Sequence, residues 1–109
     1  MQNYFRAETV LVPYPFSDLS STKVRPAIVV SAAYPSSDVI VVPLTSRTND
    51  LLPGEFILQD WKAAGLNVAS TLKRNLFLID IAIIRYRTGS ISDRDMRRVE
   101  TSLRLWLGL

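Results

Sequence analysis

Short apolar runs separated by turn-forming residues make up most of the chain. The runs at residues 9–12 (TVLV), 27–31 (AIVVS) and 39–42 (VIVV) are rich in β-branched side chains, which favour strands. The second and third runs are almost continuously apolar rather than alternating, which predicts strands buried on both faces. Pro13 and Pro15 are expected to end the first run, because proline cannot donate a hydrogen bond to a neighbouring strand.

Turn-forming segments indicate how these runs connect. Residues 33–38 (AYPSSD) join the second and third runs and supply Pro, Ser and Asp, so the two runs are predicted to pair as a hairpin. Residues 53–54 (PG) suit the centre of a type II turn. The segment that follows, residues 55–58 (EFIL), predicts a short strand.

The next part of the chain predicts one short turn and further strand. Asp60 is expected to cap a single helical turn over residues 61–64, which Gly65 ends. The apolar stretches 76–79 and 81–84 predict strands with a bend between them.

The clearest pattern lies near the C-terminal end. Ser92, followed three residues later by Asp95, forms a variant capping box in which Asp replaces the usual Glu. Behind it, four apolar residues spaced 3, 4 and 3 apart fall on one helix face: Met96, Val99, Leu103 and Trp106. Gly108 is expected to stop this helix. Together the elements predict a mainly β, single domain over residues 1–109, a strongly bent barrel or half-barrel capped by a C-terminal helix.

Composition narrows the possible chemistry. The chain has 109 residues, a net charge of +3 and a pI of about 9.6, which lies in the range of nucleic-acid-binding domains. It contains no Cys and no His, so thiolate sites, the commonest metal ligand and the commonest acid-base catalyst are all missing. We therefore expect no metal and no other cofactor. Any catalysis has to use Arg, Lys, carboxylates, hydroxyls or backbone groups.

No targeting segment is recognisable in the sequence. Residues 1–7 (MQNYFRA) precede no apolar run that could form a signal peptide. Apolar stretches such as 81–84 are far too short to span a bilayer. A cytoplasmic location without membrane contact is therefore expected.

Candidate phosphate-binding groups stand at the ends of two predicted strands. Arg25 precedes Pro26, where a Ser-rich loop enters a buried run, and its planar guanidinium can hold two phosphate oxygens at once. Thr45 and Ser46 end the VIVVPLTS segment with two hydroxyls. Taken singly, a solvated charge and two turn-stabilising hydroxyls explain these residues better. The predicted hairpin, however, places Arg25 and Thr45 at the same end of the sheet, which favours a shared site.

Further charged residues flank this site. Four cations can either contact phosphates or simply form the polar surface of a strand or bend: Lys23, Arg47, Lys73 and Arg74. Asp18, in the first long loop, is the one carboxylate that we nominate as a proton acceptor.

Three segments together resemble toxins of the MazF/PemK family. They are residues 10–31 (VLVPYPFSDLSSTKVRPAIVVS), 39–46 (VIVVPLTS) and 65–80 (GLNVASTLKRNLFLID). The resemblance implies a small SH3-like barrel of the MazF/CcdB type that forms homodimers. It also implies a metal-independent endoribonuclease that cuts single-stranded RNA and is inhibited by a partner antitoxin. The recurrent catalytic arginine and threonine of the family map to Arg25 and Thr45.

The sequence departs from some relatives, and two other functions stay open. Where certain PemK-like proteins carry an Arg-x-Asp pair, residues 72–74 read Leu-Lys-Arg, and the first loop has no His, so the general base is unassigned. One alternative is a gyrase poison of the CcdB type, whose aromatic-Gly-aliphatic tail is loosely similar to residues 106–109 (WLGL). The other is a non-catalytic SH3-like barrel that binds nucleic acid or protein.

Overall fold

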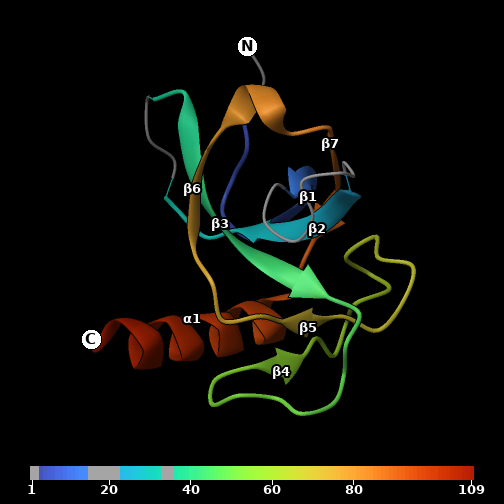
Figure 1. Ribbon diagram of the computed structural model, residues 1–109, viewed down its shortest axis with the longest axis vertical. Coiled ribbons are helices and arrows are strands. Elements are labelled where there is room, and N and C mark those ends of the chain that lie inside the picture. Colours follow the sequence, from blue (N-terminus) through green and yellow to red (C-terminus); the bar gives the residue numbers. More distant parts are fainter. Residues whose placement is uncertain (1–2, 15–22, 33–35) are drawn as a thin grey trace.

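Seven strands, a 3-10 turn and a C-terminal helix form the computed structural model, which describes residues 3–14, 23–32 and 36–109 (Figure 1). The strands are β1 (Glu8–Tyr14), β2 (Lys23–Val29), β3 (Asp38–Thr45), β4 (Phe56–Ile57), β5 (Thr71–Leu72), β6 (Phe77–Asp80) and β7 (Tyr86–Ser90). The 3-10 turn η1 covers Ile81–Ile83 and the helix α1 covers Asp93–Leu107. The predicted class, mainly β with a C-terminal helix, is confirmed.

The strands form one bent antiparallel sheet in which β3 has three neighbours. The sheet order is β4-β5-β3-β2-β1-β7, and β6 also pairs with β3. Strand β3 pairs with β6 through its first half, with β2 near its middle and with β5 at its end. The predicted hairpin of β2 and β3 is confirmed, with Ala27 opposite Pro43 and Val29 opposite Val41.

Strands β2 and β3 separate two apolar clusters, so their apolar runs are buried on both faces, as predicted. One cluster lies between the sheet and α1, and α1 lies below β3 in Figure 1. It includes Ile28 and Val42, whereas Ala27, Val29 and Val41 belong to the other cluster. Ile40 is the exception within β3, with 36% of its surface exposed.

The expectation that Pro13 ends the first strand is wrong. Strand β1 continues through Pro13 to Tyr14 and pairs with β2 over that part. Strand β7 pairs only with residues 8–11 of β1, so Pro13 has a strand neighbour on one side only. A proline is tolerated there because no donor is needed on the other side. Pro15 lies outside the described residues.

The region after β6 also differs from the prediction. Residues 81–83 form the turn η1 rather than a strand, because the Asp80 carboxylate accepts a hydrogen bond from Ala82 N–H at 2.9 Å and caps it. The bend near Asp80 is present, and 76–79 overlaps β6 as expected. Strand β7 was not predicted. Its sequence, YRTGS, is polar and contains a glycine, and its place in the sheet comes from pairing with β1.

Two turns, one just before β4 and one between β4 and β5, largely follow the prediction. Gly54 has a φ of 88°, and Glu55 N–H donates to Leu52 C=O at 2.9 Å, as a type II turn requires. Residues 61–64 form hydrogen-bonded turns rather than a helix, and Gly65 follows with a φ of 78°. Asp60 does not cap them with its side chain, which accepts two hydrogen bonds from Arg94 instead.

Helix α1 begins and ends where the sequence predicts. The Ser92 side chain accepts from Asp95 N–H, and Gly108 takes the left-handed conformation with a φ of 71°. In a capping box the Asp95 side chain would also accept from Ser92 N–H, and this half of the prediction is wrong. The buried Asp95 carboxylate accepts instead from Gln59 N–H and Asp60 N–H, at 3.0 and 2.8 Å. The apolar stripe faces the sheet as predicted. Its members are the buried Met96 and Val99 and the half-buried Leu103 and Trp106.

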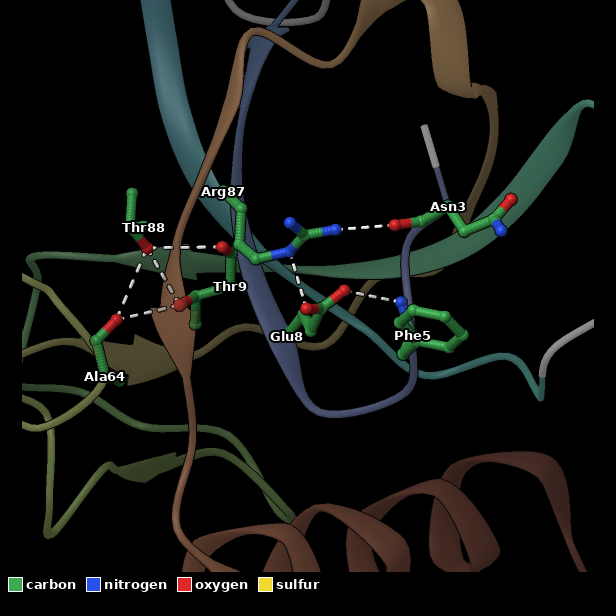
Figure 2. A network of polar contacts seen from close by, with 7 residues as sticks. All are labelled: Asn3, Phe5, Glu8, Thr9, Ala64, Arg87 and Thr88. Atoms are coloured by element: carbon green, nitrogen blue, oxygen red, sulfur yellow. Dashed lines mark hydrogen bonds and ion pairs between the residues drawn. The ribbon is translucent and has the colours of Figure 1, made fainter. Parts of the chain in front are cut away.

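A network of hydrogen bonds connects β1 to β7 and to the turn before Gly65 (Figure 2). The Thr88 hydroxyl donates to the Thr9 hydroxyl, which donates in turn to the Ala64 carbonyl, each at 2.8 Å. Nearby, Arg87 forms an ion pair with Glu8. These contacts fix the far edge of the sheet, away from the end of β3.

Candidate active site

A pocket of about 200 Å³ opens beside the end of β3. Its described lining residues come from β3, the following loop, the turn before β4, and β5 with its C-terminal extension: Thr45, Arg47, Leu51, Leu52, Glu55, Thr71 and Lys73. Strand pairing brings these segments together, because Thr45 of β3 lies opposite Thr71 of β5. The pocket therefore combines hydroxyls, two cations, one carboxylate and two apolar side chains.

Thr45 is half-buried at the end of β3 and lines this pocket. Its hydroxyl oxygen accepts a hydrogen bond from Arg47 N–H at 3.2 Å, as the turn-stabilising role predicts. A hydroxyl that accepts in this way keeps its own proton for donation. Thr45 therefore both stabilises the turn and presents a hydroxyl on the pocket wall.

Arg25 lies in β2, half-buried and opposite Val12 of β1. The register of β2 and β3 pairs Ala27 with Pro43, and beyond this last pair Arg25 precedes Ala27 by two residues while Thr45 follows Pro43 by two. Both residues therefore lie at the same end of the hairpin, as predicted. Arg25 is not among the described residues that line the pocket.

The other predicted site residues divide into two groups. Arg47 and Lys73 line the pocket together with Thr45. The Arg47 guanidinium donates to the carbonyls of Asn49 and Asp50, at 3.2 and 2.9 Å, and is thereby held over its own loop. The described lining does not include three exposed residues, Lys23, Ser46 and Arg74. Asp18, the nominated proton acceptor, lies outside the described residues.

Glu55 is the carboxylate of the described pocket lining, and the sequence patterns did not point to it. One carboxylate oxygen accepts from Leu52 N–H at 2.8 Å and the other from Arg74 N–H at 2.9 Å. Burial acts to raise the pKa of Glu55, but these two donors and the charges of Arg47 and Lys73 outweigh it and lower the pKa. The carboxylate is therefore ionised at neutral pH and fixed in orientation.

Thr71 is the second residue that the sequence patterns did not indicate. It is 1% exposed, and its hydroxyl is the one buried side-chain polar atom without a hydrogen-bond partner among the described residues. Buried hydroxyls in folded proteins nearly always have a partner. A threonine in a strand carries no special sequence signal, so only the structure distinguishes it.

The described part of the chain has neither a cluster of metal-ligating side chains nor a membrane-spanning helix. No group of three or more carboxylates among these residues is arranged to hold a metal ion. No helix among them is both long and apolar enough to cross a membrane.

Solved structures of similar fold match the chain over nearly its full length. An endoribonuclease of a mycobacterial species, in complex with its cognate antitoxin, has a TM-score of 0.79 at 17% identity, covering 98% of this chain and 97% of that one. The Mycobacterium tuberculosis toxin MazF-mt6 has a TM-score of 0.76 at 16% identity, with coverages of 94% and 97%. MazF from Deinococcus radiodurans has a TM-score of 0.77 at 21% identity, covering 97% of both chains.

Sequence comparison identifies the family. No curated protein matches the chain significantly in sequence. A family model described as the PemK-like, MazF-like toxin of type II toxin-antitoxin systems matches residues 6–107. This match spans almost the whole chain and confirms the family predicted from the three sequence segments. The chain belongs to the PemK-like, MazF-like family of type II toxins.

Proposed function

We propose that the protein is the toxin of a toxin-antitoxin pair and acts as a metal-independent endoribonuclease on single-stranded RNA. Family membership supports the toxin role, and the description of fold neighbours as endoribonucleases supports the activity. The observation that carries the proposal is that the β2–β3 hairpin holds Arg25 and Thr45 at the same end, with Thr45 on the wall of the pocket. Single-stranded RNA is the expected substrate because its unpaired bases can be splayed out and bound.

The chemistry needs only groups that this chain has. The ribose 2′-hydroxyl gives up its proton and attacks the adjacent phosphorus, the bond to the 5′-oxygen breaks, and this oxygen takes a proton from solvent water, which leaves a cyclic phosphate and a free 5′-hydroxyl. Arg25 holds two phosphate oxygens and stabilises their growing negative charge, and the Thr45 hydroxyl donates to one of them. No metal enters these steps, in keeping with a sequence that has neither His nor Cys.

Proton transfer is assigned to a carboxylate, since arginine stays protonated. Asp18 is the proposed acceptor of the 2′-hydroxyl proton, because it lies in the segment that leads from β1 into β2, the strand of Arg25. Replacing it by Asn is expected to lower the cleavage rate by about 10²–10⁴-fold, the usual contribution of a general base. An unchanged rate would remove Asp18 from the mechanism.

The proposed partners are a cognate antitoxin, RNA and a second copy of the chain. A homodimer would place two basic sites across its two-fold axis and increase the number of phosphate contacts. Lys23, Ser46, Arg47, Lys73 and Arg74 are the proposed RNA-binding residues around Arg25 and Thr45. The proposed location is the cytoplasm.

The direct test is cleavage of a long single-stranded RNA by the purified toxin in excess EDTA, with Arg25→Ala as the matched control. We expect products with cyclic phosphate and 5′-hydroxyl ends from the wild type and almost none from the variant. Full loss of activity in EDTA would contradict the metal-independent mechanism. Failure to cut any long RNA would favour the non-catalytic barrel, and inhibition of gyrase in a supercoiling assay would favour the CcdB-type alternative.

A further inference from the structure

The floor of the pocket contains a polar atom that the described residues leave without a partner. Thr71 lines the pocket, is 1% exposed and has a hydroxyl with no hydrogen-bond partner among the described residues. An unpaired buried polar atom is energetically costly, so the Thr71 hydroxyl is available to a group that supplies the missing hydrogen bond. The pocket is therefore suited to a ligand with a polar edge that reaches its floor.

The pocket wall adds a fixed hydrogen-bond acceptor. The two Glu55 oxygens are held by Leu52 N–H and Arg74 N–H, so the carboxylate is anchored to two segments of chain. A carboxylate has about four acceptor positions, so about two remain for a ligand. A carboxylate repels phosphate, so the group that it receives must be a donor such as an amino group.

The remaining lining residues suit the rest of a nucleotide. Leu51 and Leu52 are 38% and 54% exposed, and they offer apolar surfaces to the faces of a planar ring. Arg47 and Lys73 supply positive charge for the sugar-phosphate backbone. A volume of about 200 Å³ has room for one planar base.

We propose that this pocket binds one unpaired nucleobase of the RNA next to the cleavage point, and that Glu55 and Thr71 select a base carrying an amino group. The inference rests on the proposed endoribonuclease function, because Thr45 belongs to the same pocket wall. Adenine, cytosine and guanine each present an amino group to the carboxylate. Uracil presents two carbonyl oxygens beside its single N–H, and these face the carboxylate unfavourably.

A binding experiment tests the pocket without catalysis. Short 2′-O-methyl RNA oligonucleotides cannot be cut, and two that differ only by cytosine or uracil at one position have nearly the same shape. Scanning that position should reveal one site where cytosine binds about tenfold or more tightly than uracil. Equal affinities at every position would overturn the inference and leave the endoribonuclease proposal intact.

Two variants then assign the selectivity to residues. Glu55→Gln replaces half of the carboxylate by a donor, so the preference for cytosine should fall by about tenfold or reverse. Thr71→Val keeps the shape and removes a hydroxyl that has no partner among the described residues, so it should fold at least as stably as the wild type while binding the cytosine oligonucleotide more weakly. Glu100→Gln, on the exposed side of α1, is the matched control and should bind like the wild type.

Sequencing of the 5′-hydroxyl ends from a long RNA gives the corresponding cleavage profile. We expect uracil to be depleted at one fixed position next to the cut, and this depletion to weaken in both variants. If Glu55→Gln fails to fold, Thr71→Val alone decides the assignment. Wild-type base preferences in Thr71→Val would overturn it. Absence of any RNA cleavage, with selective oligonucleotide binding retained, would count against the proposed catalysis only.

Discussion

The indole nitrogen of Trp106 donates a hydrogen bond to the Pro53 carbonyl at 2.9 Å, and the ring covers Gly54. A Cβ atom at Gly54 would lie 2.4 Å from that nitrogen, so the position admits no larger residue without movement. Ser102 adds a hydrogen bond from its hydroxyl to the Gly54 carbonyl at 2.6 Å. Helix α1 therefore packs against the turn of residues 53–54, which directly precedes Glu55.

The first prediction concerns Trp106. Trp106→Ala should lower the melting temperature, with a loss of about 2–4 kcal/mol because the ring is only half-buried and a fully buried one costs about 3–5 kcal/mol. Trp106→Phe keeps most of the packing and should cost about 1 kcal/mol for the missing hydrogen bond. Thermal denaturation followed by circular dichroism measures both. A stable Trp106→Ala protein that no longer inhibits growth, without any change in RNA cleavage, would favour a gyrase poison.

Arg25 is expected to dominate catalysis. Arg25→Ala should reduce the single-turnover cleavage rate by roughly 10²–10³-fold, the usual cost of losing one preorganised donor, and Thr45→Ala should cost less. The protein should stay folded, which a melting curve checks. Arg97→Ala, an exposed arginine on α1, is the control and should cleave at the wild-type rate. A wild-type rate in Arg25→Ala would show that the site is wrongly assigned.

Lys73 and Arg74 are expected to act through their attraction to phosphate. Replacing either by Ala should weaken RNA binding and flatten the plot of log affinity against log salt concentration, by about 0.7 for each phosphate that is no longer neutralised on a single strand. Lys62, which lies over the Trp61 ring at 5.5 Å and is not among the described residues that line the pocket, provides a control. Binding is measured by fluorescence anisotropy at several salt concentrations. An unchanged slope would show that the residue concerned does not contact RNA phosphates.

The Asp60–Arg94 ion pair gives a prediction in acid. Two hydrogen bonds from Arg94, with a further one from Ser92, lower the pKa of Asp60 to about 2. Because the folded-state pKa is depressed, the stabilisation is complete above the ordinary Asp value of roughly 4 and disappears as the pH falls through about 2. Arg94→Gln should therefore melt below the wild type at neutral pH and converge with it near pH 2. A constant difference between the two melting curves across this range would contradict the assignment.

Elements defined by local signals were predictable from the sequence. Helix α1 has a cap, a stop and an apolar stripe within one short segment, and all three are found in the structure. The β2–β3 hairpin likewise follows from two neighbouring β-branched runs, and its antiparallel pairing puts Arg25 and Thr45 at the same end. Propensity alone settles such elements because their deciding contacts are close in sequence.

The features that the sequence did not predict depend on pairing between distant segments. Strand β7 has too few apolar residues to show a strand pattern in the sequence, and it forms a strand because it pairs with β1. Glu55 and Thr71 meet in one pocket because β4 pairs with β5, placing Phe56 opposite Leu72. Two-residue strands carry almost no periodicity, so the sequence offered no register from which to predict that meeting.

The pairing of β1 with β7 also sets when this fold can form during protein synthesis. Strand β1 leaves the ribosome early, but its edge partner is made only after every other strand of the described sheet, and α1 is made later still. Contacts between such distant segments form slowly, because a long loop must close first. The nascent chain consequently carries Arg25 and Thr45 long before the sheet and helix that hold them are complete. A growing or prematurely terminated chain is thus expected to be harmless to the RNA that surrounds it.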